Sequence, residues 1–85
     1  GLMKLLYFAW VRTNIGKAGE ELTPPAKVQN VEQLLNWLAT LGPQYAAALD
    51  RREVIKVAVN QEYVDPDAPV SPNDEVALFP PVTGG

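Results

Sequence analysis

The amino-acid sequence predicts a single α+β domain, in which a mixed β-sheet curls over one main helix. Apolar strand-like segments lie near both ends of the chain, and one strongly amphipathic segment lies between them. The 85 residues suffice for one domain that buries roughly 60–65% of its unfolded surface. We place this domain at residues 1–79 and a projecting tail at residues 80–85. We interpret Gly1 and Leu2, which precede Met3, as a cloning remnant, with a native extension as the alternative.

The composition excludes several kinds of chemistry in this chain. It contains no Cys and no His. A disulfide framework, a thiolate nucleophile and the commonest general base near neutral pH are therefore absent. The net charge of −3 and the pI of about 4.7 argue against a nucleic-acid partner. No apolar run reaches the ~18 residues that a membrane helix needs. With no visible signal peptide and no Cys, we expect no membrane partner and a cytoplasmic location.

Residues 4–11 are rich in aromatic and aliphatic side chains and predict the first strand. Alternation gives this segment one face of Leu5, Tyr7, Ala9 and Val11, and a second face of Lys4, Leu6, Phe8 and Trp10. Lys4 marks the second face as the one toward solvent. Its apolar residues indicate either a strand buried on both sides or a patch that binds a partner. Residues 12–19 predict a loop, either irregular throughout or with one helical turn, and residues 20–25 predict a short second strand that ends at two prolines.

The central segment predicts the main helix. Asn30 suits the N-cap, and Gln33 falls in the capping-box position three residues later. One apolar stripe at helical spacing follows, made of Val31, Leu34, Leu35, Leu38 and Leu41. We expect Trp37 to flank this stripe in the core. We expect Gly42 to end the helix in the left-handed conformation.

Further elements follow the main helix. Pro43 suits the first turn of a short helix that runs to Leu49. Its inward residues are predicted to be Tyr45, Ala46 and Leu49. Residues 54–59 predict a strand whose buried face consists of Ile55, Val57 and Val59. Asn60 begins a turn, because Asn tolerates positive φ, and residues 63–64 form a short return strand.

Residues 75–79 predict the last strand, and a Pro-Asn turn precedes it. Its buried face consists of Val76 and Leu78, and its other face of Glu75, Ala77 and Phe79. Glu75 marks that other face as the one toward solvent, so we expect Phe79 to be exposed as Phe8 is. The terminal strands are the most apolar and should lie side by side. This order of elements is the β-grasp arrangement, in which Phe8 and Phe79 become neighbours at the root of the tail.

The tail has the sequence PPVTGG. Each Pro fixes its own φ, and Pro81 favours an extended Pro80, so a stiff arm that reaches ~20 Å is expected. Gly84 and Gly85 have no Cβ, so this backbone can enter a channel that larger side chains would block. The terminal carboxylate is then a candidate substrate for another enzyme. A frayed terminus is the alternative, because a Gly-Gly pair arises by chance at roughly 1 in 200.

Three segments resemble the small, sulfur-carrier subunit of molybdopterin synthase, a family with the ubiquitin-like β-grasp fold. They are LYFAWVR at residues 6–12, VNQ at residues 59–61 and NDEVALFPPVTGG at residues 73–85. The resemblance covers the chain from Met3 onward, and its FPPVTGG ending is the most specific part. The family often has Gly where Asn73 stands and Phe where Leu78 stands. Asn tolerates the turn conformation, and the second change keeps an apolar core residue.

The resemblance implies a carrier, with catalytic side chains on its partners. An activating enzyme that uses ATP and Mg²⁺ would adenylate the Gly85 carboxylate, and sulfur from a donor protein would displace AMP to give a thiocarboxylate. The large synthase subunit, in a heterotetramer, would then use this sulfur to convert cyclic pyranopterin monophosphate to molybdopterin for molybdenum cofactor. Gly84 lies beside the reacting group. The residues implied to contact partners are Phe8, Tyr63, Phe79, Pro80, Pro81, Val82 and Thr83. No cofactor or metal is expected on this chain.

Three other functions remain open on the sequence. A thiamine-pathway sulfur carrier shares the fold and the Gly-Gly ending, but is usually shorter and lacks FPPVTGG. A ubiquitin-like modifier would use the same activated Gly85 to join target lysines. A β-grasp binding module with an incidental Gly-Gly would not depend on the last two residues.

Overall fold

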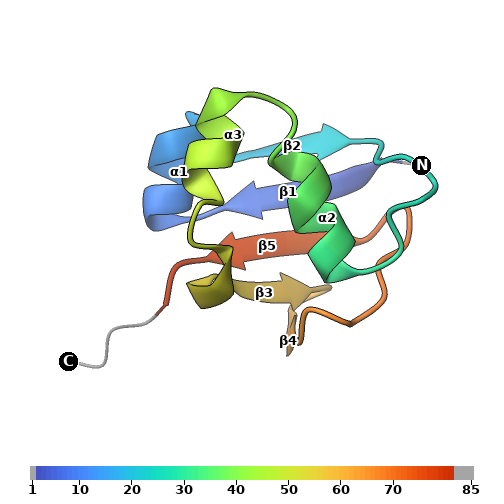
Figure 1. The fold of residues 1–85 in the computed structure, drawn as a ribbon. Coiled ribbons are helices and arrows are strands. Elements are labelled where there is room, and N and C mark those ends of the chain that lie inside the picture. Colours follow the sequence, from blue (N-terminus) through green and yellow to red (C-terminus); the bar gives the residue numbers. More distant parts are fainter. Residues whose placement is uncertain (1, 82–85) are drawn as a thin grey trace.

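The computed structural model of the protein describes residues 2–81, which form one five-stranded sheet with helices on one face (Figure 1). The strands are β1 (Met3–Tyr7), β2 (Gly19–Leu22), β3 (Lys56–Val59), β4 (Glu62–Val64) and β5 (Glu75–Phe79). The helices are α1 (Ala9–Ile15), α2 (Val31–Leu38), α3 (Pro43–Ala48) and the 3-10 helix η1 (Arg52–Val54). The strand order is β2-β1-β5-β3-β4. Within residues 2–81, no helix has the length and apolar character needed to cross a membrane.

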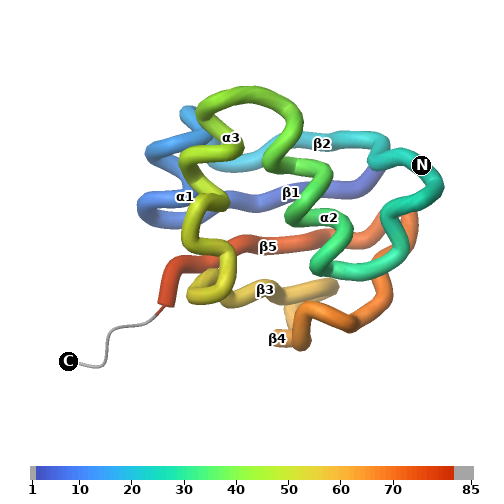
Figure 2. Tube along the Cα trace, viewed as in Figure 1, coloured from blue at the N-terminus to red at the C-terminus, as the bar shows by residue number. Residues whose placement is uncertain are grey.

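The first and last strands are parallel neighbours at the centre of the sheet, as the sequence predicts (Figure 2). Leu5 lies opposite Val76, and Tyr7 lies opposite Leu78. β5 also pairs with β3, so it is hydrogen-bonded on both sides. The core lies between the sheet and the helices. Its fully buried side chains include Leu5, Tyr7, Val31, Leu34, Leu38, Leu49, Val76 and Leu78.

Helix α2 begins as predicted. The Asn30 side chain accepts a hydrogen bond from the Gln33 backbone N–H at 2.8 Å, and the Gln33 side chain accepts one from the Gln29 N–H at 2.8 Å. The predicted stripe is buried over its first four residues, and Trp37 packs against it. Leu41 is an exception, because the helix ends at Leu38 and leaves it 38% exposed.

The boundary between α2 and α3 differs from the prediction. Gly42 has a φ of 164°, which is extended rather than left-handed, and it is the N-cap of α3. Ala46, predicted to point inward, is exposed. Ala48 is buried instead, because it lies three residues after the buried Tyr45 and therefore on the same helix face.

The first strand is shorter than predicted. It ends at Tyr7, and Ala9, with a φ of 50°, begins α1. Ala9 is therefore exposed rather than on a buried strand face, and Trp10 packs in part against the core rather than lying on the open face of the sheet. Val11 is buried as predicted, but from a helix, where it shares a face with Ile15. Over so few residues, the alternation of a strand and the spacing of a helix place the same residues on one face. The sequence pattern therefore could not tell a strand from a helix here.

The strand predicted at residues 54–59 begins only at Lys56, because the backbone up to Val54 forms η1. The turns of the second half follow the prediction. Asn60 and Gln61 both have positive φ and connect β3 to β4. Asn73 also has positive φ, and the Asp74 N–H donates to the Ser71 carbonyl at 3.2 Å. These turns set the register that brings β4 and β5 to either side of β3.

Candidate protein-interaction site

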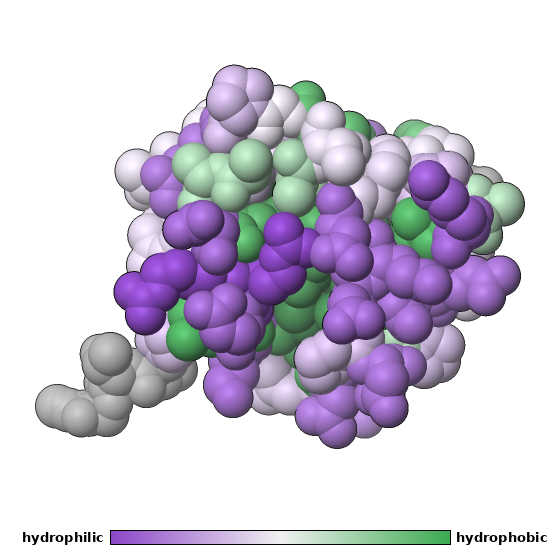
Figure 3. All heavy atoms as spheres, in the orientation of Figure 1, coloured by the Kyte–Doolittle hydropathy of each residue, from purple (hydrophilic) through white to green (hydrophobic). Residues whose placement is uncertain are grey.

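The sheet face opposite the helices carries a row of small and apolar residues. Tyr63 lies opposite Ala58 across β4 and β3, Ala58 lies opposite Ala77 on β5, and Ala77 lies opposite Leu6 on β1. The other side of the molecule, which Figure 3 shows, is covered mainly by hydrophilic side chains. An apolar row on an open sheet face has no core to cover it, so it is a candidate contact surface.

Three aromatic side chains gather on this open face, and we call them the aromatic patch: Phe8, Tyr63 and Phe79. The Phe8 and Phe79 rings stack with centroids 4.5 Å apart and an interplanar angle of 6°. Tyr63 meets Phe79 edge-on at 5.9 Å and 60°. Phe8 is 39% exposed and Tyr63 is 70% exposed, while Phe79 is half-buried. The patch is thus ordered by its own ring contacts and yet open to a partner.

The patch confirms that Phe8 and Phe79 are neighbours on the open face, but Phe79 is half-buried rather than exposed as predicted, because the Phe8 and Tyr63 rings contact it. The route to this position differs for Phe8, which is the N-cap of α1 rather than part of a strand. Its backbone N–H donates to the Leu78 carbonyl at 3.2 Å, which holds Phe8 beside β5. Tyr63 arrives from the short return strand β4. The partner-binding role of all three residues stays a prediction.

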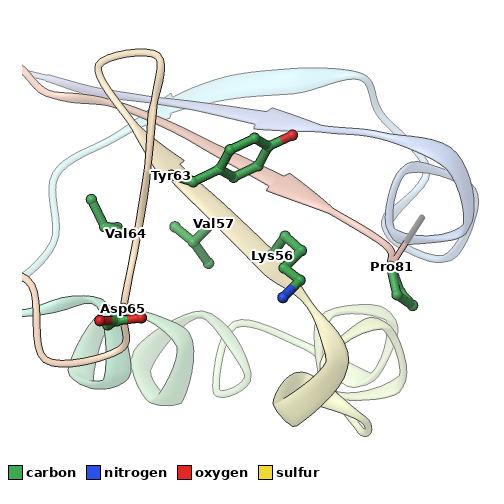
Figure 4. A pocket seen from close by; sticks show the side chains of 6 residues that line it. All are labelled: Lys56, Val57, Tyr63, Val64, Asp65 and Pro81. Atoms are coloured by element: carbon green, nitrogen blue, oxygen red, sulfur yellow. The ribbon is translucent and has the colours of Figure 1, made fainter.

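The tail begins beside the patch. Pro80 is half-buried and Pro81 is exposed. Pro81 borders a hollow of about 500 Å³ that is also lined by Lys56 and Val57 of β3, by Tyr63 and Val64 of β4 and by Asp65 (Figure 4). Val82, Thr83, Gly84 and Gly85 lie outside the described residues, so the predictions for them are not tested by the structure.

A polar cluster, which the sequence analysis did not predict, lies at the edge of the sheet that β2 forms. Glu20 of β2 accepts hydrogen bonds from the buried Tyr7 and Tyr45 hydroxyls, both at 2.7 Å. Its other oxygen pairs with the Lys17 ammonium at 3.1 Å. Burial acts to raise the pKa of Glu20, but the hydrogen bonds from Tyr45, Tyr7 and Lys17 outweigh it, and the pKa lies below its ordinary value. Burial and the Glu20 carboxylate raise the pKa of both tyrosines. This cluster ties β1, β2 and α3 together.

We expect Glu20→Gln to lower the free energy of unfolding at pH 7 by about 1–2 kcal/mol, because hydrogen bonds to a charged acceptor become neutral ones. The native carboxylate has a lowered pKa in the folded state, so its contribution is full above the unfolded pKa of about 4.3 and is lost as the pH falls through the folded pKa. Urea denaturation at several pH values measures this. The difference between native chain and variant should shrink below about pH 4. A constant difference down to pH 2 would contradict the assignment, and Glu21→Gln on the same strand is the matched control.

The open face of the described residues offers a binding surface. Among residues 2–81, no group of three or more His, Cys, Asp or Glu side chains is placed to hold a metal ion. Among the described residues, the titratable groups whose pKa is shifted belong to the Glu20 cluster, where they are hydrogen-bonded to one another. The features that remain at the open face are an aromatic patch and the root of a C-terminal tail, which suit association with another protein.

This fold, with helices on one face of a mixed sheet and a tail that follows its central strand, is that of a ubiquitin-like β-grasp domain. The crystal structure of SAMP1 from Haloferax volcanii superimposes with a TM-score of 0.74 at 26% sequence identity, and the match covers 100% of both chains. The ThiS family matches residues 5–85, and the chain belongs to this family.

Two relatives extend the comparison over almost the whole sequence. A molybdopterin synthase sulfur carrier subunit from Escherichia coli is 40% identical over 84 residues, which cover 99% of this chain and 100% of the relative. A protein of the same name from Dictyostelium discoideum is 39% identical over 84 residues, which cover 96% of this chain and 94% of the relative.

Proposed function

We propose that this chain is the sulfur-carrier subunit of a molybdopterin synthase, with Gly85 as the residue that carries sulfur. One observation carries the proposal. The family match extends to residue 85, so it includes the Gly-Gly ending, and the relatives at 40% and 39% identity are both named as this subunit. The aromatic patch beside the root of the tail supports it, because a carrier must dock so that its terminus reaches a partner's active site.

The chemistry proceeds in two steps on the terminal carboxylate. A carboxylate is a poor electrophile, so the activating enzyme, with ATP and Mg²⁺, first joins it to AMP and releases pyrophosphate. The mixed anhydride has a good leaving group. Sulfur that the donor protein releases as hydrosulfide then forms a bond to the Gly85 carbonyl carbon. The bond to AMP breaks, AMP leaves with that electron pair, and loss of the S–H proton gives the thiocarboxylate.

The loaded tail then serves the large synthase subunit. The aromatic patch docks on this subunit and the tail enters its active site. The thiocarboxylate sulfur forms a bond to a carbon of cyclic pyranopterin monophosphate, an oxygen substituent of that carbon leaves, and water then cleaves the bond between sulfur and the Gly85 carbonyl carbon, which returns Gly85 to a carboxylate. Acid and base groups for this step are supplied by the large subunit, and a heterotetramer of two small and two large subunits is the expected assembly. ATP and Mg²⁺ act in the activating enzyme and are not held by this chain.

Intact-mass measurement tests the carrier role. The protein is incubated with ATP, Mg²⁺, the activating enzyme of the same organism and a sulfur source. We expect a mass gain equal to the replacement of one oxygen by sulfur, located at Gly85 by fragmentation. An unchanged mass, with an activating enzyme that has been shown to be active, would contradict the proposal.

A second candidate function is protein modification through Gly85. The likeness to SAMP1 of Haloferax volcanii, whose name stands for small archaeal modifier protein 1, favours it. The same activated terminus would then form an amide with a lysine of a target protein. Covalent conjugates of a tagged chain in cell extract, which disappear when Gly85 is removed, would support this function. Loading with sulfur and an absence of conjugates would assign the chain to sulfur transfer alone.

A further inference from the structure

A small hollow lies inside the aromatic patch on the open face of the sheet, and we call it the notch. Its volume is about 260 Å³. Ala58 of β3 and Ala77 of β5, which lie opposite one another, form its floor. The other lining residues are the three rings of the aromatic patch, which we call its walls, Glu75, which we call its border, and Leu6 and Gln61.

The floor of the notch is enclosed although it faces away from the core. Ala58 and Ala77 are each only 6% exposed, yet neither belongs to the buried core cluster on the helix side. Neighbouring side chains on the open face therefore cover them, and the stacked rings of Phe8 and Phe79 stand beside them. Two alanines side by side leave a depression that larger residues would fill.

We propose that the notch receives a single apolar side chain of a protein partner, with a basic group of that partner facing Glu75. The inference rests on the proposed function, in which this face docks on another protein. Sites for small molecules usually measure about 300–1,000 Å³, so a notch of about 260 Å³ suits one side chain better than a cofactor. Anchor side chains that fill such depressions dominate the energetics of many interfaces.

The negative charge of Glu75 indicates which group the partner should present beside its apolar side chain. Among the described residues that line the notch, Glu75 is the charged one. Its cross-strand partner Lys4 lies opposite it on β1 but does not line the notch. Glu75 is half-buried, so an approaching partner would cover its carboxylate, and a cation at that point avoids burying an unpaired charge.

Ala58→Leu tests the inference, because its added side chain fills the notch from the floor. With the large synthase subunit of the same organism, calorimetry should show an affinity at least about 30-fold weaker than that of the native chain. Glu21→Leu is the matched control. It adds similar apolar bulk on the same sheet face but on the edge strand β2, away from the notch, and should stay within about twofold.

Two further variants keep the test decisive. Tyr63→Ala removes an exposed wall, cannot disturb the core, and should weaken binding at least about 10-fold even if Ala58→Leu does not fold. Glu75→Gln should weaken it about threefold and reduce its salt dependence. Native affinity in a folded Ala58→Leu, or in Tyr63→Ala, would overturn the inference. Sulfur loading of Gly85 is measured on the same samples. If the variants load sulfur normally and bind with unchanged affinity, the inference about the notch is wrong and the proposed function stands. If the native chain fails to load sulfur, the proposed function itself is wrong.

Discussion

Replacement of Gly84 by Trp, or addition of one residue after Gly85, is expected to abolish sulfur loading, with a loss of at least about 100-fold in rate. The first change adds a side chain where the proposed route requires bare backbone, and the second moves the carboxylate by one residue, about 3.5 Å, from the position where activation occurs. The measurement is the fraction of chain that gains the mass of one oxygen-to-sulfur exchange after a fixed time with the activating enzyme.

The matched control is one extra residue at the N-terminus. β1 and β5 are parallel, so β1 starts at the end of the sheet opposite the one where β5 ends, and an N-terminal addition changes mass and length without approaching the reacting group. This control should load at the native rate. Circular dichroism should show all three variants to be folded. Normal loading of the Gly84→Trp variant would contradict the requirement for a narrow channel, and normal loading of the extended variant would contradict the requirement for a fixed position of the carboxylate.

Replacement of Phe79 by Asp is expected to weaken binding of the large subunit about 30- to 1,000-fold, equivalent to about 2–4 kcal/mol. The change removes the ring that contacts both Phe8 and Tyr63 and places a charge in the centre of the patch. Phe79 is half-buried and lies outside the core cluster, so the domain should remain folded. Phe8→Asp should behave in the same way, because Phe8 is the other half of the stack.

The control for charge is Asn36→Asp, which also adds one negative charge but on the exposed face of α2, on the other side of the molecule. It should bind within about twofold of the native chain. Thermal unfolding is recorded for each variant. If Phe79→Asp and Phe8→Asp are unfolded at room temperature, these rings stabilise the core and their assignment to a docking surface is wrong.

Much of the fold follows from local patterns in the sequence. The cap at Asn30, the stripe of α2 and the turns at Asn60 and Asn73 each depend on neighbours within a few residues, and each is found in the structure. The side-by-side arrangement of β1 and β5 follows from their apolar character and from the burial that a small sheet requires.

The errors occur where distant parts of the chain decide the outcome. Nothing local marks Ala9 as the start of α1, because Val11 satisfies both a strand pattern and a helix pattern. The Glu20 cluster joins residues from three elements, and no spacing in the sequence brings Tyr7 and Tyr45 to one carboxylate. Phe8 and Phe79 were predictable because Lys4 and Glu75 marked the solvent side of the predicted strands, whereas Tyr63 came only from the family resemblance. The notch between the rings needed the register of β3 and β5.

The central position of β5 has a mechanical consequence. Pro80 and Pro81 follow this strand directly, so a force applied to the C-terminal end of the chain would reach β5 first. Because β5 is hydrogen-bonded to β1 on one side and to β3 on the other, such a force shears two whole ladders at once instead of opening them one bond at a time. An edge strand such as β4 is hydrogen-bonded on one side only, so a small force could separate it one bond at a time. A force on β5 is shared by the hydrogen bonds on both of its sides. The domain should therefore stay folded when its C-terminal end is pulled.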